Sequence, residues 1–88
     1  MSLNFVKLSA PWCPSCVTLG KEIYPKLIEE NSDVVFQDIN VDEQPNWIPK
    51  YSLKSLPTVL LLKNDNEVGR LVGLQSLEKY QEIINQLK

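Results

Sequence analysis

The chain has 88 residues, of which 43% are hydrophobic and 23% are charged, values that are ordinary for a globular domain and unlike those of a disordered or fibrous protein. Its net charge of −2, without histidine and without a run of lysine or arginine, argues against nucleic acid or an anionic membrane as a partner. No stretch approaches the roughly 18 apolar residues of a membrane span, and the N-terminus does not resemble a secretion signal, so we expect one soluble, cytoplasmic, monomeric domain over residues 1–88.

The first half of the chain is expected to form a strand, a helix and a second strand. Residues 4–9 alternate loosely between apolar and polar, which predicts a strand that ends before Pro11, because proline removes a donor of the strand ladder. From Cys16 onward, apolar residues recur at helical spacing and predict a helix of about four turns, which Pro25 should kink without breaking. These apolar positions are Leu19, Ile23, Tyr24, Leu27 and Ile28. The β-branched and aromatic residues of 34–39 predict the second strand.

The second half is expected to hold a loop, a hairpin and a C-terminal helix. Residues 42–52 contain two prolines and predict a loop with a brief helix. The apolar run 58–62 predicts a strand covered on both faces, and a turn over 63–67 returns the chain as a second arm, 68–72, which Gly73 ends. One face of the last helix is expected to comprise Leu74, Leu77, Tyr80, Ile83, Ile84 and Leu87. The order β-α-β-α-β-β-α indicates the α/β class.

The two cysteines, Cys13 and Cys16, lie three positions apart between the first strand and the first helix. Unpaired N–H groups of a first helical turn favour the thiolate of Cys13, and Pro14 suits the first helical position because its missing N–H is not needed there. A Cys13 thiolate can attack a disulfide, and Cys16 can then resolve the mixed disulfide. This chemistry needs one exposed and one shielded sulfur, and the spacing predicts that asymmetry.

Two other roles for the cysteine pair are less well supported. A zinc site usually needs four nitrogen or sulfur ligands, and the chain offers two thiols and no histidine, so metal binding would require carboxylates or a second chain. A purely structural disulfide across so short a loop would constrain little of the unfolded chain. We therefore expect no bound metal or other cofactor, and a redox-active disulfide between Cys13 and Cys16.

The sequence around the cysteines resembles the thioredoxin family. Residues 12–16 (Trp-Cys-Pro-Ser-Cys) are similar to its Trp-Cys-x-x-Cys active site, 40–45 resemble the segment after its second core strand, 51–58 its cis-proline loop, and 72–73 the end of its hairpin. These blocks follow the family's usual spacing from Phe5 to the C-terminus. The resemblance implies a minimal thioredoxin fold, with a four-stranded mixed sheet flanked by helices, and a thiol–disulfide oxidoreductase that reduces protein disulfides.

The resemblance also implies a set of site residues. Pro57 would be cis and face the cysteines, leaving the backbone beside it free to pair with an extended substrate; the alternative is an ordinary trans proline. An apolar rim around Cys13 would bind the substrate with Pro57, and Pro14 and Ser15 would support the cysteines. The expected rim residues are Trp12, Val41, Leu56, Val72 and Gly73. Each of these could instead be a plain core or surface residue, Val41 above all.

Two departures from the family concern the substrate. The sequence begins directly at the strand before the cysteines, without the extra N-terminal strand and helix of thioredoxins, and Pro14-Ser15 replaces the usual Gly-Pro, as in glutaredoxins. Glutaredoxins, however, bind glutathione through a Gly-Gly and an acidic residue after the hairpin, where this chain has Val72-Gly73-Leu74-Gln75. We expect protein disulfides as substrates, with a flavoprotein like thioredoxin reductase as donor and ribonucleotide reductase as one candidate acceptor. A glutathione-dependent enzyme and a non-enzymatic interaction module are the alternatives.

The third departure concerns a buried charge pair. Many thioredoxins carry an aspartate on the strand before the active site and a lysine on the next strand, whereas the corresponding residues here are Lys7 and Asp38. Because a lone buried charge is unfavourable, we expect the two to pair behind Cys16, with Asp38 as the candidate proton acceptor for that thiol. The alternative is that Lys7 extends to solvent and Asp38 caps a turn.

Overall fold

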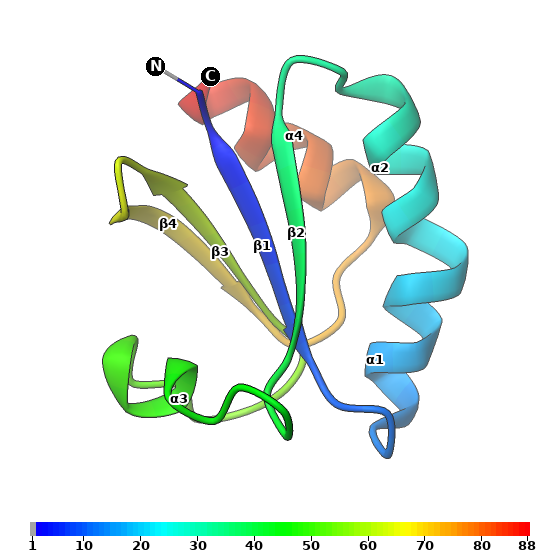
Figure 1. The fold of residues 1–88 in the computed structure, drawn as a ribbon. Coiled ribbons are helices and arrows are strands. Elements are labelled where there is room, and N and C mark those ends of the chain that lie inside the picture. The colour runs from blue at the N-terminus through cyan, green and yellow to red at the C-terminus, as the bar shows by residue number, and fades with distance from the viewer. Residues whose placement is uncertain (1) are drawn as a thin grey trace.

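The computed structural model of the chain describes residues 2–88, and Met1, which the expected domain includes, lies outside this range. Its centre is a sheet of four strands in the order β2-β1-β3-β4 (Figure 1). The strands are β1 (Asn4–Ser9), β2 (Val35–Asn40), β3 (Thr58–Lys63) and β4 (Asn66–Val72). β1 runs parallel to β2 and antiparallel to β3, which is antiparallel to β4. This is the mixed sheet expected from the sequence.

A long helical segment follows β1 and runs without a break through α1 (Pro14–Thr18), a π-helical turn η1 (Leu19–Ile23) and α2 (Tyr24–Glu30). At Pro25, where the sequence predicts a kink without a break, the helix continues and has a wider π turn just before the proline, in which the Tyr24 N–H donates to the carbonyl of Leu19. A proline has no N–H for the preceding turn, and π turns are one way in which a helix absorbs such a defect. Within residues 2–88, none of the helices has the length and apolar character needed to cross a membrane.

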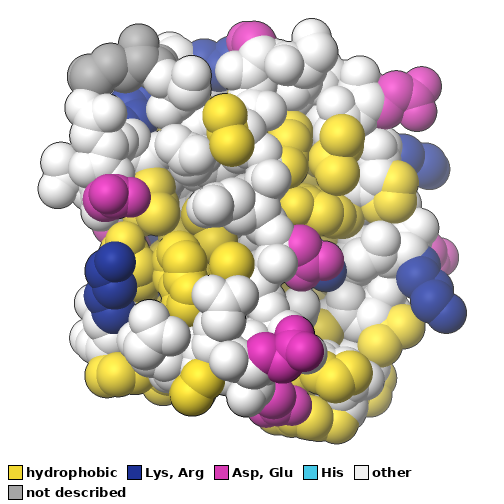
Figure 2. Space-filling model, in the orientation of Figure 1, with side chains coloured by type: hydrophobic (Ala, Val, Ile, Leu, Met, Phe, Trp, Pro, Cys, Tyr) yellow, Lys and Arg dark blue, Asp and Glu magenta, His cyan; other side chains and the backbone are white. Residues whose placement is uncertain are grey.

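The helices cover the two faces of the sheet unequally. The long helical segment and α4 (Leu77–Leu87) lie on one face, where Phe5, Leu61 and Tyr80 belong to the larger apolar cluster. The short helix α3 (Trp47–Lys50) lies on the other face, beside a second cluster that includes Leu8 and Leu60. Because α3 covers only part of its face, hydrophobic side chains gather at the surface there (Figure 2).

Three details of the elements differ from the sequence-based expectation. Ile28 is 44% exposed, so the buried face of the long helix does not include it. Leu74 precedes α4 and is exposed, because the helix begins only after Ser76, whose side chain caps it by accepting the Lys79 N–H. β4 begins two residues early at Asn66, since the turn is confined to residues 64 and 65, both with positive φ. The brief helix expected within 42–52 is confirmed as α3.

Candidate active site

The two cysteines lie where β1 passes into α1. Cys13 is the N-cap residue with extended backbone angles, and its Sγ accepts the N–H of Cys16 at 3.3 Å. Pro14 occupies the first helical turn, and the Ser15 hydroxyl lies 3.3 Å from the Cys13 sulfur. Both cysteines are free thiols. The local sequence therefore turns unpaired donors of the helix start toward the sulfur of Cys13.

The predicted contrast between an exposed and a shielded sulfur is wrong in its simplest form, because both residues are buried, Cys13 at 6% and Cys16 at 3% exposure. The asymmetry lies in what each thiol faces. Cys13 lines a groove on the α3 side of the motif, whereas Cys16 lines a separate cleft with Lys7.

The same surroundings separate the acidities of the two thiols. Burial raises the pKa of Cys13, but hydrogen bonds from Cys16 and Ser15 outweigh it, and the pKa of Cys13 lies below its usual value. For Cys16, burial and the hydrogen bond with Cys13 raise the pKa to about 11, against smaller opposite effects of the Ala10 backbone and the Lys7 ammonium. Cys13 is thus the thiol that ionises first, and Cys16 retains its proton.

The groove in front of Cys13 has a volume of about 340 Å³. Three of the expected rim residues line it, namely Trp12, Val41 and Leu56. Trp12 is 67% exposed, and its indole Nε1 donates to Asp42 Oδ2 at 2.9 Å, which fixes the ring over the groove. Val41 is only 3% exposed, so it serves both as a core residue and as the floor of the groove.

Sequence reasoning missed five residues that line the groove. These are Asp42, Ile48, Leu53, Lys54 and Ser55. All of them lie inside the two blocks 40–45 and 51–58 that resemble the family, or in α3 between these blocks, and this position was the available signal. The expected rim residues Val72 and Gly73 do not line the groove, and neither does Pro57.

The loop before β3 brings Pro57 close to the cysteines. The Leu56–Pro57 peptide bond is cis, which confirms that prediction, and the Leu56 carbonyl oxygen lies 3.9 Å from the Cys13 sulfur. The Pro57 carbonyl is not free, because it accepts the N–H of Gly73 at 2.8 Å. Gly73 has a φ of +80°, and Val72 is 47% exposed beside it. The end of the hairpin therefore flanks the proline loop outside the groove.

Lys7 and Asp38 occupy neighbouring positions on the parallel strands β1 and β2, and Lys7 Nζ lies 3.3 Å from Asp38 Oδ1. Lys7 is only 5% exposed, so it does not extend to solvent, and its ammonium lies 5.1 Å from the centre of the Tyr24 ring. A Cβ on Gly20 would lie 3.1 Å from the same nitrogen, so this glycine leaves room for the charge. The pair lines, with Cys16, a cleft of about 320 Å³.

Metal ligands do not gather anywhere in residues 2–88: no three Cys, Asp or Glu side chains of that range lie close enough together to hold an ion. The two thiols of the site differ in role: Cys13 has the lowered pKa and lines the groove, whereas Cys16 has the raised pKa and lines the cleft with the charged pair.

Known proteins resemble this chain in sequence and in fold. A family model described as thioredoxin matches residues 2–86. Thioredoxin H5 of Oryza sativa subsp. japonica is 34% identical over 82 residues, which cover 93% of this chain and 59% of the rice protein. Thioredoxin of Chlamydia caviae is 33% identical over 84 residues, covering 96% of this chain and 81% of that protein. The structure of Fasciola hepatica thioredoxin covers 99% of this chain and 82% of its own, with a TM-score of 0.90 and 30% identity. The chain belongs to the thioredoxin family of thiol–disulfide oxidoreductases.

Proposed function

We propose that this oxidoreductase reduces disulfide bonds of proteins by dithiol exchange through Cys13 and Cys16. The Cys13 thiolate attacks one sulfur of the substrate disulfide, and the other sulfur leaves as a thiolate. Cys16 then attacks the Cys13 sulfur, closes the Cys13–Cys16 disulfide and releases the second substrate thiolate. Two electrons pass to the substrate in total. The observation that carries this proposal is the position of Cys13, a thiol of lowered pKa that opens onto a groove.

The groove supports an extended polypeptide as the substrate. Its lining is largely apolar, with Asp42 and Lys54 as the charged members. Within residues 2–88, the N–H of Leu56 has no hydrogen-bond partner, while the carbonyl of the same residue faces Cys13. An extended chain lying across Cys13 can pair with this backbone as an added strand. Trp12, Pro57, Val72 and Gly73 would then border the bound segment.

The resolving step needs a base, because a thiol whose pKa is about 11 is almost wholly protonated near neutral pH. Asp38 supports this role by its place in the cleft that Cys16 and Lys7 also line. We assign it as proton acceptor from Cys16, with Lys7 holding the carboxylate in place. In Asp38→Asn, resolution of a mixed disulfide should slow markedly, whereas Asp33→Asn, which alters a carboxylate paired with Lys88, should not change it. An unchanged rate in Asp38→Asn removes the proton-transfer role.

The electron donor distinguishes two forms of the function. A thioredoxin-reductase-like flavoprotein should recycle the oxidised protein, and ribonucleotide reductase is one candidate acceptor. Insulin reduction is measured with thioredoxin reductase and NADPH, and separately with glutathione, glutathione reductase and NADPH. Faster turnover with the flavoprotein is expected, and turnover with glutathione alone would instead indicate a glutaredoxin-like enzyme. If turnover in both assays is no higher than that of the Cys13→Ser control, the protein is an interaction module and not an enzyme.

The direction of electron flow follows from the reduction potential of the Cys13–Cys16 pair. Equilibration with glutathione should give a value near the thioredoxin figure of about −270 mV, and one near about −120 mV would mean an oxidant instead. The cytoplasm is the proposed compartment. Its support is that the chain has two cysteines, both in the redox motif, and thus no further pair for a structural disulfide.

A further inference from the structure

One wall of the substrate groove comes from a single stretch of chain. Ile48 of α3 and residues 53–56 line it, and Tyr51 and Ser52 lie between these lining positions. The stretch contains no strand and only the one-turn helix α3, whose end is closed by backbone bonds such as that from the Leu53 N–H to the Ile48 carbonyl at 2.9 Å. Bonds to neighbouring elements then fix where this turn lies relative to the sheet.

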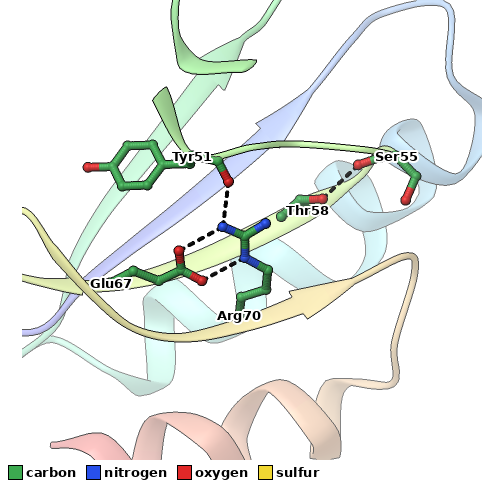
Figure 3. A network of polar contacts seen from close by, with 5 residues as sticks. All are labelled: Tyr51, Ser55, Thr58, Glu67 and Arg70. Atoms are coloured by element: carbon green, nitrogen blue, oxygen red, sulfur yellow. Dashed lines mark hydrogen bonds and ion pairs between the residues drawn. The ribbon is translucent and has the colours of Figure 1, made fainter. Parts of the chain in front are cut away.

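The strongest of these bonds comes from β4. Arg70 Nη2 donates to the carbonyl oxygen of Tyr51 at 2.6 Å, at the point where α3 ends (Figure 3). Ser52, the next residue, has a φ of +53°, so the chain leaves the helical conformation immediately after this carbonyl. Carbonyls at a helix end lack partners within the helix, and here a guanidinium supplies one. A second bond holds the other end of the loop, where the Thr58 hydroxyl donates to the Ser55 carbonyl at 2.6 Å.

Arg70 is itself held in a fixed direction. Its Nε and Nη2 donate to the two carboxylate oxygens of Glu67 at 2.6 and 2.7 Å, a bidentate arrangement. The two side chains are 26% and 33% exposed, so water competes only partly for these bonds. A planar fork that is bound on one side presents its remaining N–H groups in one geometry. In Figure 3 the guanidinium lies between the Glu67 carboxylate and the Tyr51 carbonyl.

We propose that Arg70, oriented by Glu67, is a positioning residue that holds the groove wall of residues 48–56 in the conformation that binds an extended substrate. The proposal rests on the proposed function, since it concerns the protein-binding groove of the same site. Arg70 makes no contact with the reacting sulfurs, and the chemical steps at Cys13 and Cys16 do not involve it. Replacing Arg70 should therefore leave the reduction of substrates that need only the thiol unchanged, whereas it should raise the KM for substrates that occupy the groove.

The test compares Arg70→Met, Arg70→Lys and Glu67→Gln with the wild type. Glu67→Gln removes the charged partner that orients Arg70 and should raise the KM for insulin, by less than Arg70→Met does. Insulin is the substrate that fills the groove, and the small aromatic disulfide 5,5′-dithiobis(2-nitrobenzoate) is the one that needs only the thiol. In Arg70→Met, the KM for insulin should rise roughly five- to tenfold, the factor that one net hydrogen bond corresponds to, with kcat changed less than about twofold. Arg70→Lys should recover part of the loss, because lysine can still donate to one carbonyl.

Two controls separate positioning from general damage. Lys79→Met breaks an exposed ion pair on α4 and should leave both substrates unaffected. Arg70→Met should still fold, because the Tyr51 hydroxyl keeps its own bond to the Asp65 carbonyl and the Tyr51 ring stays stacked on Trp47. Amide hydrogen exchange reports the wall directly, and the Leu53 N–H, bonded to the Ile48 carbonyl, should exchange faster in this variant.

The outcomes are distinct. An Arg70→Met protein with unchanged KM for insulin, or one whose losses are equal for the two substrates, overturns the positioning role. A wild-type protein that reduces the small disulfide and not insulin overturns the proposed function instead.

Discussion

The Lys7–Asp38 pair predicts that two substitutions which break the same contact differ in their effect on stability. Lys7 is 5% exposed, whereas the side chain of Asp38 is 54% exposed. Asp38→Asn leaves a buried ammonium without its carboxylate, which is the unfavourable way to break such a pair. Lys7→Met removes the buried charge and keeps an unbranched apolar chain against Tyr24.

The magnitudes follow from these exposures. Removing one partner of a fully buried pair costs about 3–5 kcal/mol, and an exposed pair is worth about 0–1 kcal/mol. With its carboxylate half exposed and 3.3 Å from the ammonium, Asp38→Asn should lower the free energy of unfolding by about 1–2 kcal/mol. Lys7→Met loses a cation–π contact of about 0.5–1 kcal/mol but no longer buries a charge, so it should match or exceed the wild type.

Urea denaturation of the reduced proteins, followed by the fluorescence of Trp12 and Trp47, measures these differences. The double variant Lys7→Met/Asp38→Asn should be as stable as Lys7→Met alone, because without Lys7 the carboxylate of Asp38 has no buried cation to neutralise. Asp33→Asn is the matched surface control and should change stability by less than about 0.5 kcal/mol. If Lys7→Met proves less stable than Asp38→Asn, the buried ammonium stabilises the fold by itself, and the reasoning from desolvation is refuted.

Three further predictions concern thiol reactivity, alkaline stability and the hairpin. Iodoacetamide near neutral pH should modify Cys13 before Cys16, whose pKa is about 11, and equal labelling by peptide mass spectrometry would contradict the assigned acidities. Burial, with a smaller effect of the Asp38 charge, raises the pKa of Tyr24 to about 12, so between about pH 10 and 12 the folded state keeps a proton that the unfolded state has lost. Stability should fall with rising pH in that window, and Tyr24→Phe should show a smaller fall in urea midpoint; an identical fall would exclude Tyr24 as its source. Asp65→Gly should raise the free energy of unfolding by about 0.5 kcal/mol, and the urea midpoint with it, because residues 64 and 65 both have positive φ and Asn-Gly suits such a turn. A lower midpoint would show that the Asp65 side chain stabilises the turn by more than its backbone strain costs.

The sheet could be predicted from the sequence because its strands carry their own signal. Residues 58–62 form a continuous apolar run, and the structure buries the strand β3 over most of its length. Cys13 and Cys16 lie between a predicted strand and a predicted helix, and the structure has both at that strand-to-helix junction. Such features depend on neighbours in the chain, which is the information that a sequence pattern holds.

The features that could not be predicted from the sequence depend on contacts between residues far apart in the chain. Whether Ile48 and Leu53 face Cys13 depends on the path of an irregular loop, for which period-2 and period-3.6 patterns carry no signal. The bond from Arg70 to Tyr51 uses a backbone carbonyl, which has no residue-specific mark in the sequence. Ile28 lies at the edge of the apolar face that the sequence pattern predicts, and the structure leaves it 44% exposed.

The π turn η1 adjusts the angular phase of the long helix. Its buried positions are Cys16, Leu19, Tyr24 and Leu27, so Tyr24 takes the place against the sheet that regular spacing would give to Ile23. Each residue of an α-helix turns the chain by about 100°, and the surplus residue of the turn absorbs a rotation of this size. The first turn can therefore orient the two thiols while the later turns orient the core, on one uninterrupted helix. Deleting one residue within 19–23 would restore a regular helix and force a choice between these two orientations.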